Sequence, residues 1–309
     1  MKGLVLKSTG SWYLILGDDG KEYRGRARGK LRLDDVRTTN PIAVGDGVLF
    51  EMEAQSQEDD LVNIHEILPR RNYIIRKSNN LSKQTQIIAA NMDLVALVVT
   101  MATPATSTGF IDRFLLTAEA YHIPALIVFN KIDIYGEVES ALLQEYERIY
   151  EKIGYECIQV SAIRGTNMNE LRDKLRHKTT LFSGHSGVGK STLMNALDPH
   201  IAQKTAAIST YSNKGKHTTT FAEMFLTENE CRLIDTPGIK DFGVVNLDKH
   251  ELAHYFPEMR SRMQGCRFND CLHTEEPNCA ILAAVESGEI EPSRYYSYLS
   301  VLNNEDIHH

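Results

Sequence analysis

The sequence predicts a multi-domain α/β protein, and three patterns along the chain predict it. Residues 1–72 alternate short strand patterns with turns that contain Gly and Asp, which is typical of a small β-barrel. Residues 91–245 alternate apolar runs with segments of helical spacing, which favours a doubly wound sheet. From residue 246 onward, helical segments flank a cluster of cysteines. We therefore expect domains at 1–72, 91–245 and 246–309, and a polar, basic linker at 73–90.

The composition is that of a soluble globular protein. Of the 309 residues, 42% are apolar and 24% are charged, and no apolar run approaches the roughly 18 residues of a membrane span. We expect a cytoplasmic monomer without membrane contact. The net charge of −7 excludes attraction of the whole molecule to nucleic acid, so such a partner must meet a local basic patch.

One basic row lies in the N-terminal region. Its members recur at every second position, so a strand would place them on one face: Arg24, Arg26, Arg28, Lys30 and Arg32. On an OB-type barrel this face suits the phosphate backbone of RNA. A solvated strand face, or a loop whose charges pair with Glu22, Asp34 and Asp35, would explain the same residues.

The middle region alternates strands with helices. We expect strands at 93–100, Ala125–Phe129, 156–162, Thr179–Ser183, 221–226 and 231–234. Helices are expected at 111–121, from about 137 to Gly154, at 169–177 and at 191–197. After residue 246 we expect helices at 251–259, 278–286 and 292–303, and the aromatic and leucine stripe of the last one is interpreted as core packing.

Residues 184–191, GHSGVGKS, fit the phosphate-binding loop pattern between a strand and a helix. Glycines let backbone N–H groups turn toward phosphate oxygens, and the helix N-terminus adds partial positive charge. Lys190 is predicted to reach the β- and γ-phosphates, and the Ser191 hydroxyl to bind Mg²⁺. The predicted phosphate-binding residues are Gly184, His185, Ser186, Gly187, Val188, Gly189, Lys190, Ser191, Thr192 and Gly238.

Residues 130–133, NKID, follow a predicted strand and match the pattern that reads guanine. Asp133 can accept hydrogen bonds from N1–H and the 2-amino group, which adenine does not offer, and Lys131 can lay its stem against the base. Asn130 can tie this loop to the phosphate loop. The full predicted guanine set is Asn130, Lys131, Ile132, Asp133, Ser161 and Ala162, with a backbone N–H of the last pair for guanine O6.

Asp235-Thr-Pro-Gly238 ends another predicted strand. The carboxylate can hold a water of Mg²⁺, and the Gly238 N–H can meet the γ-phosphate. A threonine of the preceding polar segment should complete the Mg²⁺ shell, with Thr219 as first candidate and Thr218 as second. Both segments would then order on GTP and release after hydrolysis.

Ile239 follows Gly238, where Ras-like enzymes carry the glutamine that orients the attacking water. Isoleucine cannot orient water, so another group must do so. His217 is the candidate catalytic residue nearest in sequence. A structural histidine, or one that contacts a partner, would fit the same position.

The order of these motifs differs from that of a Ras-like domain. The guanine-reading loop and Ser161-Ala162 come first, and the phosphate loop, the threonines and Asp235 follow. This order predicts a circularly permuted Ras-like P-loop GTPase domain. It also makes the segment after Asp235 run directly into the C-terminal region.

The C-terminal region contains three cysteines and a histidine at close spacing: Cys266, Cys271, His273 and Cys279. Three thiolates and one imidazole make a closed tetrahedral set that suits one structural Zn²⁺, so this region is predicted to be a mostly helical zinc-binding domain. Cys157 and Cys231 fall in strand patterns and are expected to be buried without a metal.

These features together resemble the ribosome small-subunit-dependent GTPase A (RsgA/YjeQ) family of bacterial assembly factors. The resemblance covers nearly the whole chain, from the barrel through GHSGVGKS, NKID, HTTT and DTPG to the Cys/His cluster. It implies GTP hydrolysis stimulated by the small ribosomal subunit, a role in late maturation of that subunit, and contact with rRNA. Ile163 after Ser161-Ala162, and Asn167 in the following turn, depart from the usual pattern.

Two other functions remain open at this point. A GTP-regulated binding module for another protein or RNA would use hydrolysis only to reset itself. A regulator that senses zinc would use metal occupancy as its signal, although four closed ligands favour a structural metal.

Overall fold

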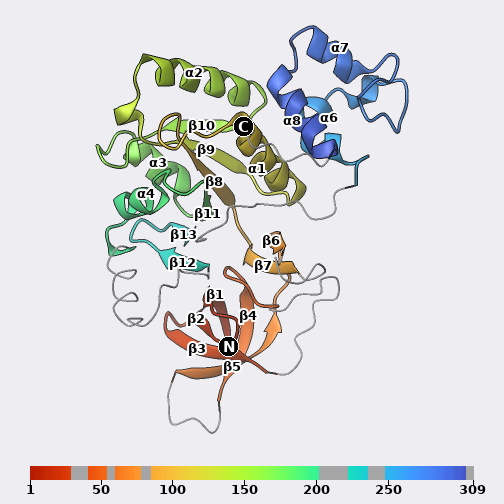
Figure 1. Ribbon diagram of the computed structural model, residues 1–309. Helices are drawn as coiled ribbons and strands as arrows, with labels where there is room; N and C mark the ends of the chain where they lie inside the picture. The colour runs from red at the N-terminus through yellow and green to blue at the C-terminus, as the bar shows by residue number, and fades with distance from the viewer. Residues whose placement is uncertain (29–40, 54–59, 78–84, 202–221, 236–247, 304–309) are drawn as a thin grey trace.

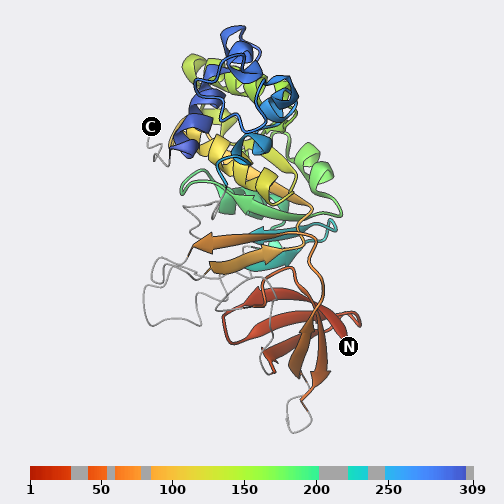
Figure 2. The ribbon, with the colours of Figure 1, turned by 90° about the vertical axis from the view of Figure 1, so that its right-hand side faces the viewer.

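The computed structural model describes residues 1–28, 41–53, 60–77, 85–201, 222–235 and 248–303. The molecule is elongated, with the N-terminal barrel at one end, the α/β domain in the middle and the C-terminal helices at the other end (Figures 1 and 2). None of the helices in these ranges is long and apolar enough to cross a membrane.

Five strands of the described N-terminal residues close into a barrel. Their order is β1-β2-β3-β5-β4, and a further pairing of β1 with β4 closes the ring. Side chains alternate between inside and outside, and the inner ones, such as Ile15, Phe50 and Ile64, form a separate core. This confirms the OB-like barrel. The strands are β1 (Lys2–Ser8), β2 (Tyr13–Gly17), β3 (Glu22–Ala27), β4 (Gly47–Met52) and β5 (Leu61–Ile67).

A two-stranded hairpin lies within the range expected to be a linker. β6 (Tyr73–Lys77) and β7 (Thr85–Ala90) pair antiparallel. The hairpin is fixed to the barrel because the Ala90 N–H donates to Val44 O and the Asn91 side chain donates to Gly45 O, both at 2.9 Å. The C-terminal end of this hairpin is therefore held by contacts with the barrel.

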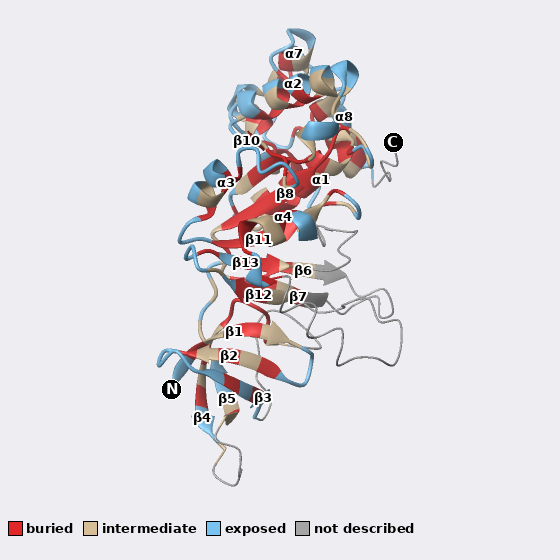
Figure 3. Cartoon of the chain, turned by 90° about the vertical axis from the view of Figure 1, so that its left-hand side faces the viewer, coloured by how far each residue is buried: buried red, intermediate tan, exposed pale blue. Residues whose placement is uncertain are grey.

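The α/β domain is built on six strands in the order β10-β9-β8-β11-β13-β12. All neighbours are parallel except β12, which pairs antiparallel with β13. Figure 3 shows the burial concentrated along these strands. They are β8 (Leu94–Val99), β9 (Ala125–Phe129), β10 (Glu156–Gln159), β11 (Thr179–Ser183), β12 (Glu223–Leu226) and β13 (Arg232–Asp235).

Helices cover both faces of this sheet, as expected for a doubly wound domain. The side chains of α1 (Thr108–Ala120) and α2 (Glu137–Lys152) join one apolar core, and those of α3 (Met168–Leu175) and α4 (Lys190–Leu197) join the other. A short 3₁₀ turn, η1 (Ile132–Ile134), follows β9. The strand that leads into the phosphate loop is β11. It is the fourth strand of this domain along the chain, after β8, β9 and β10, and it lies near the centre of the sheet.

The barrel joins the sheet of the α/β domain through one strand pair. β1 lies antiparallel to β12 with Lys7 opposite Glu223, so that one sheet runs through both domains. The Lys7 ammonium also meets the Glu223 carboxylate at 2.7 Å.

The C-terminal region is docked on α1 by a buried charged network. Arg294 is 1% exposed and donates to Asp112 of α1 and to Glu258, both at 2.7 Å. The expected helix at 251–259 is instead divided, because Pro257 begins a new short helix. The elements are η2 (Leu252–Tyr255), α6 (Pro257–Arg260), η3 (Met263–Gly265), α7 (Ala280–Glu286) and α8 (Pro292–Leu302).

Candidate nucleotide-binding site

The phosphate loop connects β11 to α4, and its glycines are required by close packing. At Gly184 (φ 141°) an added Cβ would lie 2.2 Å from Val98 O, and at Gly189 (φ 94°) it would lie 2.6 Å from the Asn130 side-chain nitrogen. No other residue fits these positions without moving the neighbouring strand or the guanine loop. The loop thus has the compact form that phosphate binding needs.

Lys190 opens α4 and is folded back onto the loop. Its Nζ donates to Gly184 O at 2.6 Å and to His185 O at 2.8 Å. Burial lowers the pKa of Lys190, while the charge of Asp235 raises it. The ammonium therefore lies inside the loop, close to where phosphate oxygens would sit.

Asn130 ties three loops together. It is 2% exposed, its Nδ2 donates to Val188 O at 2.9 Å, and its Oδ1 accepts from the Ala162 N–H at 3.3 Å. The predicted contact between the guanine loop and the phosphate loop is therefore present in the structure.

Asp133 is held by the Ser161 hydroxyl, which donates to its carboxylate at 2.5 Å. The Arg164 N–H in turn donates to the Ser161 hydroxyl at 3.1 Å. Lys131 adopts a left-handed conformation (φ 65°), and its Nζ donates to Gly187 O at 2.6 Å. The base-reading groups are thus arranged beside the phosphate loop.

Sequence reasoning missed Tyr135, which supports this arrangement. Its hydroxyl donates to Asn130 O at 2.6 Å and accepts from the Met101 N–H at 2.9 Å. A tyrosine two residues past the motif carries no signal of its own, since its role depends on a strand end about thirty residues earlier in the chain.

The predicted Mg²⁺ ligands are only partly described. Ser191 is exposed at the start of α4, and Asp235 ends β13 in register with Phe182 of the neighbouring β11. The other predicted residues of this end, His217, Thr218, Thr219 and Gly238, lie outside the described residues.

A family model described as RsgA GTPase matches residues 67–245, and one described as RsgA N-terminal domain matches residues 2–58. The chain belongs to the RsgA GTPase family. RsgA GTPases are P-loop GTP hydrolases, and this chain is one of them.

Relatives and solved structures agree with this assignment along the whole chain. Proteins named small ribosomal subunit biogenesis GTPase RsgA, from Christiangramia forsetii and Bacteroides fragilis, are 52% and 50% identical over 306 residues, which is 99% of this chain and 97% of each relative. YjeQ from Thermotoga maritima matches with a TM-score of 0.77 and 32% identity over 98% of this chain and 97% of that chain. YloQ, described as a circularly permuted GTPase, matches with a TM-score of 0.73 and 28% identity over 98% and 94%. The permuted order of the motifs is thus shared with a solved structure.

The four predicted zinc ligands form a cluster in the C-terminal region. Their ligand atoms all lie within 4.8 Å of one another, and His273 Nδ1 is 3.4 Å from Cys279 Sγ and 3.6 Å from Cys266 Sγ. Burial raises the pKa of Cys271 to about 12 in the absence of a cation. The donor set and its size fit one Zn²⁺, which would bind the thiols as thiolates.

Two tyrosines of α8 support the cluster from behind. The Tyr295 hydroxyl donates to His273 O and the Tyr298 hydroxyl to Leu272 O, both at 2.7 Å. Core packing is the role predicted for the aromatic stripe of the last helix, and Tyr298 is fully buried. It also fixes the backbone that carries a candidate ligand.

The basic row on the barrel is described in part. Arg24 and Arg26 are exposed on the outer face of β3, and Arg28 follows the end of the strand. Ion pairs join Arg26 to Glu53 and Arg28 to Glu51. Lys30 and Arg32 lie outside the described residues. Of the five basic residues, Arg24 and Arg26 are therefore the two that β3 places on one face.

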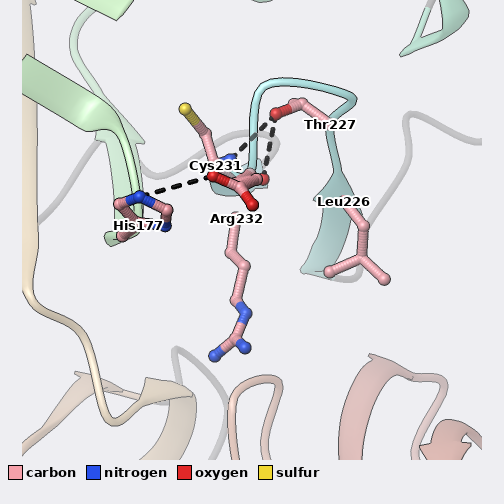
Figure 4. A pocket seen from close by; sticks show the side chains of 6 residues that line it. His177, Leu226, Thr227, Cys231 and Arg232 are labelled. Atoms are coloured by element: carbon pink, nitrogen blue, oxygen red, sulfur yellow. Dashed lines mark hydrogen bonds and ion pairs between the residues drawn. The ribbon is translucent and has the colours of Figure 1, made fainter. Parts of the chain in front are cut away.

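A separate pocket lies at the opposite end of β11 and β13 from the phosphate loop (Figure 4). His177 and Glu230 meet at 3.3 Å beside it, and both are mostly exposed. Its remaining lining residues are Leu226, Thr227, Cys231 and Arg232. Since the phosphate loop follows the other end of β11, this pocket is not part of the nucleotide site.

Proposed function

We propose that this chain hydrolyses GTP to GDP and phosphate as a factor in biogenesis of the small ribosomal subunit, and that this subunit stimulates the hydrolysis. The observation that carries the proposal is Asn130, which joins the guanine loop to the phosphate loop through Val188 O and to the Ser161-Ala162 loop through the Ala162 N–H. Relatives that match nearly the whole chain are named small ribosomal subunit biogenesis GTPases, which supports the choice of partner.

In this proposal the base and the phosphates are bound by different loops. Asp133 accepts from N1–H and the 2-amino group of guanine, Ala162 offers its N–H to O6, and Lys190 binds the β- and γ-phosphates. The Ser161 hydroxyl supports this role of Asp133, because it already holds the carboxylate at 2.5 Å.

Mg²⁺ would be held by Ser191, Thr219 and, through a water, Asp235. The ion would supply positive charge to the β- and γ-phosphate oxygens. His217 is proposed to orient the attacking water, since Ile239 cannot do so. Gly238 would donate its N–H to the γ-phosphate.

One Zn²⁺ bound by Cys266, Cys271, His273 and Cys279 would have a structural role. The close grouping of the four ligand atoms supports this. We further propose the division into 1–72, a connecting 73–90, 91–245 and 246–309. The family models match residues 2–58 and 67–245, so the second of them also takes in residues 67–90.

The basic row on the barrel would contact the rRNA of the small subunit. Arg24 and Arg26 support this role because they are exposed on one face of β3. We expect the chain to act as a cytoplasmic monomer without membrane contact.

The decisive experiment compares GTP turnover by the chain alone, with small subunits and with large subunits. We expect a strong increase with small subunits only. Turnover that is equal in all three reactions would contradict the proposal and favour a GTP-regulated binding module for another protein or RNA. Lys190→Ala serves as the control for contaminating hydrolases.

A further inference from the structure

Helix α1 lies between the phosphate loop and the C-terminal region, and contacts each with a different face. Phe110 and Asp112 are two positions apart, and each helical residue turns the direction by about 100°. Their side chains therefore point to opposite sides of the helix. Phe110 meets the phosphate loop, and Asp112 meets α8.

On the first face, the Phe110 ring stacks on the His185 ring. The ring centroids are 3.6 Å apart and the planes are inclined by 30°. His185 belongs to the phosphate loop, and its carbonyl oxygen accepts from Lys190 Nζ at 2.8 Å. One loop residue thus connects α1 to the lysine that is proposed to bind phosphates.

Phe110 is itself firmly placed. It packs against the apolar core of the α/β domain, and its N–H is capped by the Ser107 hydroxyl at 3.4 Å. Burial and the neighbouring Lys190 charge lower the pKa of the His185 imidazole, which favours the neutral ring in this contact. An aromatic pair of this kind stabilises its geometry without needing a charge.

On the opposite face, α1 is anchored by the C-terminal region. Asp112 accepts from Arg294 at 2.7 Å and from the Ser297 hydroxyl at 2.5 Å, all of them buried. Leu116, one turn further along α1, is part of the apolar core of the C-terminal region. Movement of α1 relative to the C-terminal region would break these contacts.

We propose that Phe110 is a positioning residue for the phosphate loop, and that α1, anchored by the C-terminal region, uses the Phe110–His185 contact to hold the loop ready for phosphates. The inference rests on the proposed nucleotide site. A loop with three glycines has many conformations, so a contact that reduces them before binding increases affinity.

The test is titration of fluorescent GDP against Phe110→Leu, Phe110→Tyr and His185→Gln, with thermal unfolding of each protein. Phe110→Leu and His185→Gln are expected to weaken GDP binding by about three- to tenfold, mainly through faster release. Phe110→Tyr keeps the aromatic ring and should bind as the wild type does.

Phe114→Leu is the matched control, because it makes the same change one turn along α1, at a side chain buried in the core. It should lower the unfolding temperature and leave GDP affinity within about twofold. The double variant Phe110→Leu/His185→Gln should bind no more weakly than the worse single variant, because both lose the same contact.

The anchoring half of the inference is tested with Arg294→Met and the milder Ser297→Ala. At least one of these two variants should fold and, as a single substitution, weaken GDP binding. The same substitution combined with Phe110→Leu should cause no further loss of GDP affinity. Three results would overturn the inference. The first is unchanged GDP affinity in Phe110→Leu and His185→Gln, and the second is additive losses of GDP affinity in the double variants. The third is unchanged GDP affinity in both Arg294→Met and Ser297→Ala. A wild-type chain that fails to bind GDP would instead contradict the proposed function.

Discussion

The two ends of the nucleotide site differ in how ready they are for their ligand. At the base end, Asp133 is already oriented by Ser161, and Asn130 already joins the two loops. At the phosphate end, the Lys190 ammonium is occupied by two carbonyl oxygens of its own loop. Choice of base therefore requires little rearrangement, whereas phosphate binding requires Lys190 to exchange partners.

This difference assigns separate physical tasks to the two ends. Oriented acceptors discriminate between bases, because a wrong base would leave a polar group without a partner. The lysine supplies charge for affinity, and its contacts with two carbonyl oxygens keep the loop compact. Substitutions at the two ends should therefore have different effects on affinity and on selectivity.

The largest effect on affinity is expected from Lys190→Ala at the phosphate end. Loss of the charge should weaken GTP binding by about 100-fold or more while the ratio of GTP to XTP affinity stays the same. Fluorescent nucleotide titration measures both quantities. Lys174→Ala, which removes an amine that pairs with Glu156 on the surface, is the control. Binding of GTP within about twofold of wild type in Lys190→Ala would remove the lysine from the phosphate site.

The next effect is expected from Asn130→Ala, which uncouples the two ends. The change leaves Val188 O and the Ala162 N–H without their partner, at a cost of about 1–3 kcal/mol. GTP and XTP should lose affinity alike, since Asn130 holds the loops together and is not proposed to read the base. A selective loss for GTP alone would show that Asn130 contacts guanine. Isothermal titration with both nucleotides distinguishes these results.

A smaller effect is expected from Ser161→Ala at the base end. Removing one hydroxyl that orients Asp133 should weaken GTP binding by about two- to tenfold, and Ser161→Thr should restore most of it. Equal binding by Ser161→Ala and wild type would mean that Asp133 is oriented by the backbone alone. Competition titration against fluorescent GDP is sensitive enough for this difference.

Removal of the metal is expected to have the smallest effect on the nucleotide site, with no change in base selectivity. A strong chelator, or Cys279→Ser, should unfold the C-terminal region and lower its melting temperature, because four ligands then lose their common cation. The ratio of GTP to XTP affinity should not change, since the base end is formed by loops that do not contact the cluster. Circular dichroism follows the unfolding. A melting profile that does not respond to the chelator would contradict the zinc assignment.

Much of the site could be predicted from the sequence because its motifs are local. The phosphate loop, residues 130–133 and the Cys/His cluster each occupy a short stretch, and strand ends bring them together. The strand Ala125–Phe129 is predicted at its observed bounds, since continuous apolar runs identify buried parallel strands. Thr179–Ser183 is also predicted at its observed bounds, because the phosphate loop pattern follows it directly.

What the sequence missed depends on contacts between distant segments. The pairing of β6 with β7 is anchored by barrel residues, and it joins two short apolar segments that a polar, basic stretch separates in the sequence. The stacking of Phe110 on His185 and the pairing of Arg294 with Asp112 join residues that have no shared pattern in the sequence. Only the fold brings these partners together.

The most direct test of the preformed guanine site is the nucleotide preference of Asp133→Asn. An asparagine can still accept from the Ser161 hydroxyl through its oxygen, but its amide repels the 2-amino group of guanine and can donate to the 2-oxo group of xanthine. We expect at least about 100-fold weaker GTP binding and a switch of preference to XTP. GTP affinity that is unchanged in this variant would contradict the account.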